Sequence, residues 1–246
     1  MNRRDALKLA GGSFLAAASC GYAFRLITAA DTAEIDDEGS SKGKKYGMVI
    51  DLTKCKSDCT ACVDACRNEN NVAHFDDPRW DVHWIRKVKL KSKDDETAEK
   101  KTMLLLCNHC DRPPCAQVCP VQATYKRDDG IVIVDHHRCI GCRYCMIACP
   151  YNARFFNFKD NQEWINKDYP KRSHGVAEAC TLCAHRLERG RLPACVEACK
   201  KTGADAIQVG DMNDPESNVA KLIDTHAVKR IREDLGTEPK VHYIGL

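Results

Sequence analysis

The sequence predicts an α+β protein with two small βαβ-type modules, one interleaved into the other, plus an inserted hairpin and a helical and extended C-terminal tail. Two observations predict this class. Short apolar strands run into cysteine groups at two places, and turn residues followed by an apolar strand come after two further groups. The 246 residues suffice for one or two domains with a buried core. The 17 cysteines exceed what such a chain needs for stapling, so their chemistry has to be explained first.

The two strands that precede cysteine groups are similar to each other. Residues Met48 to Leu52 read as a strand that leads to Cys55, and residues Val132 to Val134 read as a strand that leads to Cys139. Aligned on these cysteines, the two segments share an apolar pair, an aspartate and a basic residue. The similarity indicates an internal duplication.

A second similarity follows the other two groups. After Cys119 the chain has a turn at 126–130 and the strand Ile131 to Val134, which together predict a β-hairpin. After Cys199 turn residues again lead to a short apolar strand, which ends near Gly210. The strand before the first cysteine group and the strand after the last one are the halves missing from one module, so that module is predicted to enclose the other.

The first 30 residues have the layout of an export signal. The pair Arg3-Arg4 precedes the weakly apolar run Leu9 to Phe24. This arrangement is typical of a twin-arginine signal, which sends folded, cofactor-loaded proteins across a membrane; the alternative is a disordered amphipathic tail. The run is short and rich in Gly and Ala, so it is a poor permanent spanning helix. We assign Cys20 to this leader rather than to a lipid-attachment site.

Two further segments complete the organisation. Residues 80–106, with Val82 and Trp84 alternating as in a strand, are predicted to form a hairpin with a solvated charged tip, and Pro215 with apolar residues at helical spacing predicts one short helix before an extended tail. The predicted organisation is an export signal (1–30), a linker (31–45), the first half of module A (46–79), the inserted hairpin (80–106), module B (107–160), the second half of module A (161–212) and a C-terminal tail (213–246).

Sixteen of the 17 cysteines fall into four groups of four. The groups are Cys55, Cys59, Cys62 and Cys66; Cys107, Cys110, Cys115 and Cys119; Cys139, Cys142, Cys145 and Cys149; and Cys180, Cys183, Cys195 and Cys199. Disulfides fit this pattern poorly, because C-x2-C spacing gathers thiols in one loop where long-range staples are not expected. Structural zinc is the stronger alternative, since two C-x2-C pairs make one tetrahedral site.

The spacing of the third group favours iron–sulfur clusters over zinc. Cys139, Cys142 and Cys145 are followed by Cys149-Pro150, which is the bacterial ferredoxin run in which three thiolates hold one cubane and the fourth reaches a neighbouring cluster. Each of the other groups also ends in an x3-Cys arm. Four groups of four ligands therefore imply four [4Fe-4S] clusters that work in pairs, and both modules are predicted to be bacterial-ferredoxin-like.

Other function classes find no support in the sequence. The formal net charge is +3 with basic and acidic residues interspersed, so there is no nucleic-acid footprint. A dinucleotide fingerprint, a P-loop and a nucleophile with a base at motif spacing are all missing, which indicates a non-catalytic electron carrier. Lys54, Arg138 and Arg143 lie next to ligands, where positive charge would raise a potential; the alternative role is surface solubility.

The chain resembles a known family, the four-cluster ferredoxin-like electron-transfer subunits of membrane-linked respiratory oxidoreductases, including the dimethyl sulfoxide, formate, polysulfide and nitrite (NrfC) systems. The resemblance covers nearly the whole chain. It includes the four groups in order, the segment Cys-Pro-Tyr-Asn-Ala-Arg at 149–154, and the segments 183–186 and 193–199. Within the family, the leader, the overall length and the lack of a C-terminal anchor look most like the DsrO-type subunit of the Dsr membrane complex of sulfate reducers.

The resemblance implies a nested assignment of ligands. It implies one cluster held by Cys55, Cys59, Cys62 and Cys199, a second by Cys180, Cys183, Cys195 and Cys66, a third by Cys107, Cys110, Cys115 and Cys149, and a fourth by Cys139, Cys142, Cys145 and Cys119. Two departures from the family pattern fall on the first pair. Three residues separate Cys55 from Cys59 where the family has two, and Lys200 follows Cys199 in place of proline.

The resemblance also implies a setting. We expect an extracytoplasmic subunit, exported by the twin-arginine route and membrane-associated through its partners, in a hetero-oligomeric respiratory complex. It would link a polytopic, quinone-interacting membrane subunit of the NrfD or DsrP type to a cytochrome or another redox protein. One alternative is the iron–sulfur (beta) subunit of a molybdopterin oxidoreductase, and another is a zinc-stapled scaffold. No nucleic acid is expected as a partner.

Overall fold

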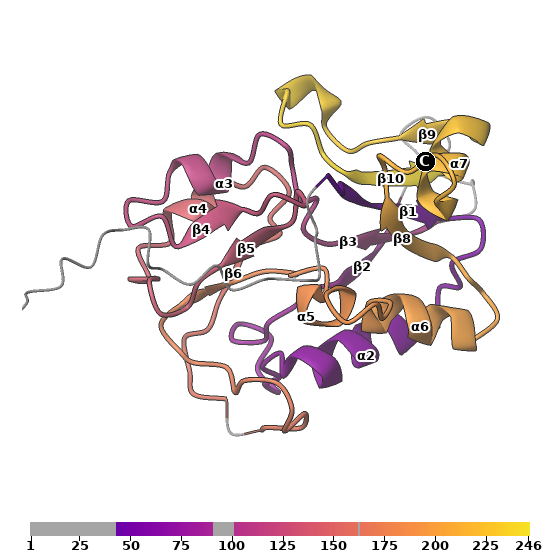
Figure 1. The fold of residues 1–246 in the computed structure, drawn as a ribbon. Coiled ribbons are helices and arrows are strands. Elements are labelled where there is room, and N and C mark those ends of the chain that lie inside the picture. Colours follow the sequence, from indigo (N-terminus) through magenta and orange to yellow (C-terminus); the bar gives the residue numbers. More distant parts are fainter. Residues whose placement is uncertain (1–42, 91–100, 162) are drawn as a thin grey trace, which may run out of the picture. The chain divides into compact units, whose positions relative to one another are not determined.

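The computed structural model of the chain describes residues 43–90, 101–161 and 163–246 (Figure 1). The predicted export signal, the linker up to residue 42 and most of the predicted hairpin tip lie outside these residues. These described residues belong to one compact unit. None of its described helices is long and apolar enough to cross a membrane.

A four-stranded sheet brings the beginning and the end of the described chain together. Its central strand β1 (Tyr46–Asp51) pairs antiparallel with β8 (Ile207–Asp211) and parallel with β10 (Val241–Ile244), and the short strand β9 (Val228–Lys229) covers the outer edge of β10. Because β1 is buried on both faces, it reads as a continuous apolar run rather than an alternating one.

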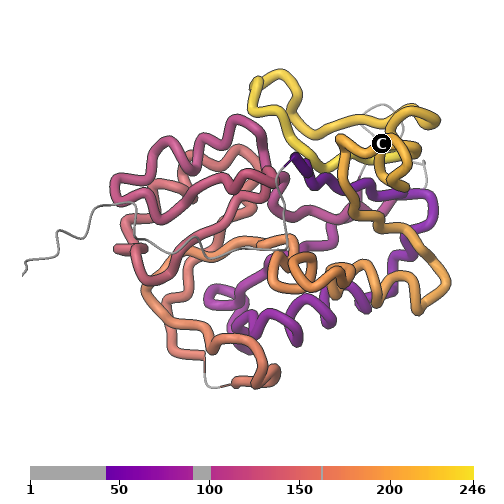
Figure 2. Tube along the Cα trace, in the orientation of Figure 1, coloured from indigo at the N-terminus to yellow at the C-terminus, as the bar shows by residue number. Residues whose placement is uncertain are grey.

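Three helices accompany this sheet. Helix α2 (Ala61–Asn70) packs against α6 (Ala194–Lys201), and Figure 2 shows these indigo and orange segments side by side although they lie more than 120 residues apart in sequence. Helix α7 (Asn218–Thr225) packs against β8 and starts at Ser217, whose hydroxyl accepts a hydrogen bond from the Ala220 N–H.

The middle of the chain forms a second set of elements. Strands β4 (Thr124–Lys126) and β5 (Val132–Val134) form an antiparallel hairpin, and the one-turn helix α3 (Pro114–Gln117) packs against α4 (Tyr144–Ala148). An antiparallel pair of strands and a pair of packed helices are thus found here as well as around β1.

Several short elements connect these parts. Strands β2 (Arg86–Lys89) and β3 (Thr102–Leu105) form the inserted hairpin, β6 (Phe155–Phe156) pairs with β7 (Ala177–Glu178), and the chain continues from β7 into helix α5 (Ala184–Leu187). A single 3-10 turn, residues Glu233–Leu235, precedes β10.

The predicted α+β class, both hairpins, the short helix and the extended tail are confirmed, with two differences in detail. Strand β2 starts at Arg86, not at Val82, because Trp84 turns into the core and its Nε1–H donates to the buried Glu178 carboxylate. The extended tail is also more than a tail, since it enters the main sheet beside β1 as β10.

Candidate metal centres

All sixteen predicted ligands lie in the described residues, and all of them are free thiols. Ten are buried. The half-buried ones are Cys55, Cys59, Cys119, Cys139, Cys142 and Cys149. Exposure is therefore concentrated in the first and third groups of the chain and in Cys119, whereas the group at 180–199 is buried throughout.

Helix packing brings the outer two cysteine groups together. Cys62 and Cys66 lie four residues apart on α2, and Cys195 and Cys199 lie four residues apart on α6. Residues at this spacing share one face of a helix. Because α2 packs against α6, both pairs of thiols face the same interior region.

The electrostatics of these thiols separate them into two sets. Burial raises the pKa of Cys55, and the charges of Cys199 and Cys59 raise it further. Burial followed by the charges of Cys55 and Cys199 raises the pKa of Cys62 to about 11.

The second set forms around Cys66. Burial raises the pKa of the Cys66 thiol well above its usual range, and the next causes are the charges of Cys180, Cys195 and Cys183. Cys62 also acts on Cys66, so the two sets adjoin.

Burial and neighbouring cysteines also raise the pKa of thiols in the middle two cysteine groups. Burial raises the pKa of Cys110 to about 11, and Cys115 and Cys149 add to this effect. Burial also raises the pKa of Cys145, where Cys115, Cys139 and Cys142 contribute. The charge of Cys149 therefore acts on the 107–115 group.

For Cys119, no other cysteine is among the causes of its pKa shift, so electrostatics do not indicate which set it joins. Burial tends to raise its pKa, yet the backbone N–H groups of residues 121–124 lower the pKa below the usual value. The Thr124 N–H donates to Cys119 Sγ at 3.5 Å. This cradle of amides stabilises a thiolate without help from another side chain.

Backbone N–H groups also reach three other sulfurs. Cys139 Sγ accepts from the Ala177 N–H at 3.4 Å, Cys180 Sγ from the Leu182 N–H at 3.4 Å, and Cys199 Sγ from the Ala206 N–H at 3.2 Å. Hydrogen bonds to ligand sulfurs are a principal means by which a protein sets the potential of an iron–sulfur cluster.

Two buried polar side chains without an assigned role in the sequence prediction contact sulfurs directly. Asn70 Nδ2 lies 3.8 Å from Cys66 Sγ and 3.6 Å from Cys183 Sγ, and Arg154 Nη2 lies 3.1 Å from Cys115 Sγ. Arg154 belongs to the quoted segment at 149–154, so a signal for it existed; Asn70 ends α2 and had no comparable signal.

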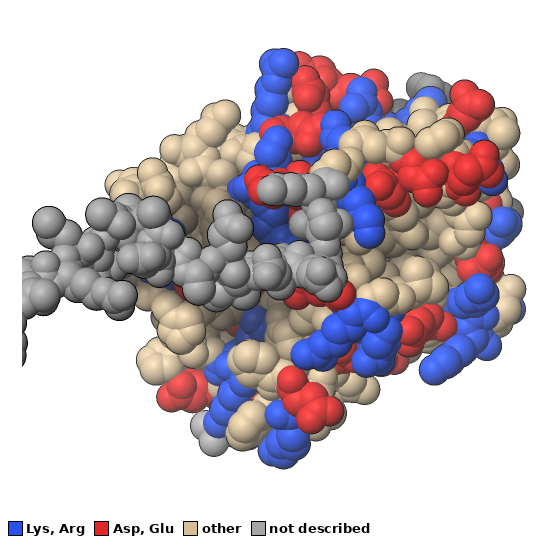
Figure 3. All heavy atoms as spheres, in the orientation of Figure 1, with Lys and Arg blue, Asp and Glu red and all other residues tan. Residues whose placement is uncertain are grey.

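The charged residues that the sequence places next to ligands lie at the surface. Lys54 pairs with Asp51 at 3.5 Å, Arg138 pairs with Asp135 at 3.7 Å, and Arg143 lies over the Phe156 ring at 5.4 Å. Figure 3 shows acidic and basic side chains interspersed on one face of the protein. These three charges are screened by solvent or by a partner.

The histidines next to ligands have partners other than a metal. The His109 Nδ1 accepts from the Val132 N–H at 3.1 Å, and burial lowers the His109 pKa to about 3, so the ring is neutral. His185 Nε2 pairs with Glu69 at 2.9 Å. These contacts give both histidines a role as neighbours of ligands rather than as ligands themselves.

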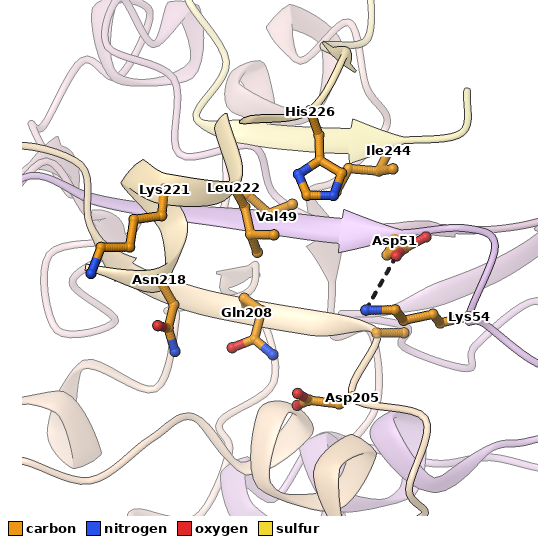
Figure 4. A pocket seen from close by; sticks show the side chains of 11 residues that line it. Val49, Asp51, Lys54, Asp205, Gln208, Asn218, Lys221, Leu222, His226 and Ile244 are labelled. Atoms are coloured by element: carbon orange, nitrogen blue, oxygen red, sulfur yellow. Dashed lines mark ion pairs between the residues drawn. The ribbon is translucent and has the colours of Figure 1, made fainter. Parts of the chain in front are cut away.

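A cavity elsewhere in the fold is not lined by any of these thiols. It has a volume of about 290 Å³ and lies among β1, β8 and α7, where Figure 4 shows Asp51 and Lys54 paired with each other at its rim. In the described residues, no three His, Cys, Asp or Glu side chains converge closely enough to hold one metal ion.

The donor sets suit iron–sulfur clusters. Thiolates are soft ligands, which bind zinc, copper(I) and iron–sulfur clusters in preference to hard cations. Buried thiols with a raised pKa are neutral unless a cation compensates the thiolate charge, and a cluster supplies that compensation. The Nε–H of Arg154 is buried beside these sulfurs with no acceptor among the described residues, and sulfide is a suitable acceptor. These features define an iron–sulfur protein of the ferredoxin type.

Comparisons with known proteins agree. Residues 101–211 match the 4Fe-4S dicluster domain. The chain is 42% identical to the Hdr-like menaquinol oxidoreductase iron-sulfur subunit 1 of Archaeoglobus fulgidus, covering 100% of this chain and 98% of that protein. It is 41% identical to a tetrathionate reductase subunit of Salmonella typhimurium, covering 85% and 75%, and 36% identical to a polysulfide reductase subunit of Wolinella succinogenes, covering 82% and 94%. The chain belongs to this family of respiratory iron–sulfur subunits.

Proposed function

We propose that the protein relays electrons through four [4Fe-4S] clusters between a quinone-interacting membrane subunit and a partner redox protein, and that it performs no substrate chemistry itself. The observation that carries this proposal is the succession of cysteine sets. Cys62 acts on Cys66, Cys180 acts on Cys107, and Cys115 acts on Cys145, so each set adjoins the next.

The exposure of the ligands supports a relay with two accessible ends. The set with Cys55 and Cys59 and the set with Cys139 and Cys142 are half-buried, whereas the sets between them are mainly buried. When bound, a cluster supplies reversible one-electron transfer. The protein residues hold each cluster, exclude water from the middle of the row and leave its ends near the surface.

The proposed ligand assignment follows the resemblance. Cys199 joins the set of Cys55, Cys59 and Cys62, Cys66 joins that of Cys180, Cys183 and Cys195, Cys149 joins that of Cys107, Cys110 and Cys115, and Cys119 joins that of Cys139, Cys142 and Cys145. The electrostatic neighbours support the first three of these assignments. In this proposal module A encloses module B, with the module boundaries at 46–79, 107–160 and 161–212.

The longer loop between Cys55 and Cys59 is held by hydrogen bonds from Lys87 of the inserted hairpin. Lys87 Nζ donates to the carbonyl oxygens of Lys56, at 2.7 Å, and of Cys59. The positive charge of Lys87 also opposes the rise that burial causes in the pKa of Cys55. We assign Lys87, from the inserted hairpin, the role of holding the enlarged loop in place.

The names of the relatives support the proposed partners. The Archaeoglobus fulgidus relative is named as a subunit of a menaquinol oxidoreductase, which supports a quinone-interacting partner. We propose, from the resemblance of the sequence, that this partner is a membrane subunit of the NrfD or DsrP type and that the chain has a DsrO-type role in a sulfate reducer. We further propose twin-arginine export and a position on the periplasmic side of the membrane, with a cytochrome or other redox subunit as the second partner.

The alternative is an iron–sulfur subunit that feeds a large molybdopterin-containing catalytic subunit. The similarity to the tetrathionate reductase and polysulfide reductase subunits favours it. Isolation of the native complex separates the two proposals: molybdopterin in a co-purifying large subunit supports the alternative, and a cytochrome without molybdopterin supports the relay to a redox protein.

Metal analysis tests both proposals. Protein purified without oxygen is expected to contain about sixteen iron atoms per chain with a matching amount of acid-labile sulfide, because four cubanes carry four irons each. Near-stoichiometric zinc with little iron would instead establish the zinc-stapled scaffold.

A further inference from the structure

Arg154 is the most unusual charged residue of the described structure. Its side chain is only 3% exposed. The other buried basic residues each lie near a carboxylate: Arg186 pairs with Glu69, Lys240 pairs with Asp111, and the charge of Arg172 acts on Glu178. Arg154 has no such partner among the described residues, although an unpaired buried charge is costly.

The charged neighbours of the Arg154 guanidinium are cysteines instead. Burial tends to lower the pKa of Arg154, but the charges of Cys115, Cys107, Cys145 and Cys149 raise it. Three of these cysteines belong to the ligand set of 107–115 with Cys149, and Cys145 belongs to the set of 139–145. One guanidinium therefore lies against two neighbouring ligand sets.

Hydrogen bonds connect Arg154 to both sets as well. Nη2 lies 3.1 Å from Cys115 Sγ, and Nη1 donates to Thr124 Oγ1 at 3.2 Å. The backbone N–H of the same threonine donates to Cys119 Sγ. The remaining Nε–H is buried without an acceptor among the described residues. The guanidinium thus contacts Cys115 of one set directly and is linked through Thr124 to Cys119, the arm cysteine of the other set.

We propose that Arg154 is the shared counter-charge of the two clusters held by residues 107–149 and that it raises the reduction potential of both. The inference rests on the proposed four-cluster function. Reduction adds one negative charge to a cluster, and a buried cation close to its sulfurs stabilises the reduced state with little screening by solvent. At the interior set of Cys66 and Cys183, the side chain that contacts the sulfurs is the neutral Asn70, at 3.8 and 3.6 Å. Arg186 also acts on Cys183, but it is paired with Glu69, whose charge opposes it.

The test is an anaerobic redox titration of the full chain, followed by electron paramagnetic resonance, for the wild type and four variants. Arg154→Gln is expected to lower the reduction equilibrium constants of two of the four clusters at least tenfold. For a one-electron couple this lowers the reduction potential by about 59 mV. The other two signals are expected to keep their potentials. The Cys142→Ser variant identifies the affected pair, since it removes one of its signals.

Two matched variants separate charge from position. Arg154→Lys keeps a cation but loses the planar fork. The reduction equilibrium constants of its clusters are therefore expected to stay within tenfold of the wild-type values. Arg138→Gln removes an exposed charge beside Cys139. It is expected to change the reduction equilibrium constant of every cluster by less than tenfold.

Three results would overturn the inference: an iron-complete Arg154→Gln protein whose potentials do not move, an equal shift of all four signals, or an Arg154→Lys shift as large as that of the glutamine variant. If the glutamine variant loses iron, the lysine variant decides, because retained potentials support the inference and lowered ones refute it. Wild-type protein without about sixteen irons would refute the proposed function itself, a result distinct from unmoved potentials in loaded protein.

Discussion

Gly141 lies between Cys139 and Cys142 in the loop that opens the third cysteine group, with φ of +69°. A Cβ atom at this position would lie 2.4 Å from the Gly175 carbonyl oxygen. Two constraints therefore coincide at one residue: a left-handed backbone conformation and a close approach of the segment that leads to β7. Loops around iron–sulfur clusters depend on such close approaches, since several ligands must reach one small volume.

Replacing Gly141 with alanine is expected to destabilise the protein by about 3 kcal/mol, from left-handed strain of about 1 kcal/mol and a steric clash of about 2 kcal/mol. Gly190→Ala is the matched control, because its φ is +67° and open space surrounds it, so only about 1 kcal/mol is expected. Anaerobic thermal unfolding of the loaded proteins measures the difference. Equal losses in the two variants would show that the Gly175 contact contributes nothing.

Strand β10 shows how one element depends on its neighbours. It is a short run, Val-His-Tyr-Ile, that the sequence marks only as extended, yet Tyr243 is fully buried and its hydroxyl donates to the Leu104 carbonyl at 2.8 Å. His242, opposite Val49 of β1, is half-buried and its Nδ1 has no partner among the described residues. Burial and the charge of Arg230 lower its pKa to about 4, although Glu233 opposes this.

This depressed pKa predicts a specific acid sensitivity. Unfolded chain takes up a proton on His242 near pH 6.5, whereas the folded protein resists it down to about pH 4, so stability present above pH 6.5 is lost as the pH falls toward 4. Allowing for solvent screening, the loss between pH 7 and pH 5 is about 1 kcal/mol. His242→Gln is expected to reduce the accompanying fall in Tm by about 2–4 °C.

The control for His242 is His226→Gln, which replaces an exposed histidine just before β9. This variant is expected to show the same fall in Tm between pH 7 and pH 5 as the wild type. If His242→Gln behaves in the same way, the acid sensitivity of the sheet does not come from β10.

At the scale of the whole molecule, the arrangement depends on segments from opposite ends of the sequence. Cys199 lies more than 130 residues after the first cysteine group, yet its charge acts on Cys55 and Cys62. Packing of α2 against α6 and pairing of β1 with β8 both produce this proximity. The two ends of the fold and the first ligand set therefore stabilise each other.

Cys199→Ser tests this dependence. The variant is expected to lose up to about four irons per chain, because one ligand of a cubane is missing, and to alter the resonance signal of the adjoining cluster. Cys20→Ser is the control, since Cys20 stands outside the four groups and lies outside the described residues; its iron content is expected to equal that of the wild type. Full iron content in Cys199→Ser would contradict the ligand assignment.

The amino-acid sequence by itself determined the cysteine groups, their spacing, the duplicated strands, both hairpins and the α+β class, because these depend on residues close together in the chain. It also indicated the family through short segments such as 149–154. Only the tertiary structure decided that the C-terminal strand enters the main sheet, that Arg154 and Asn70 lie against ligand sulfurs, and that Lys54 and Arg138 pair at the surface. Which charge lies beside a sulfur depends on packing between distant segments, and local pattern carries no record of that packing.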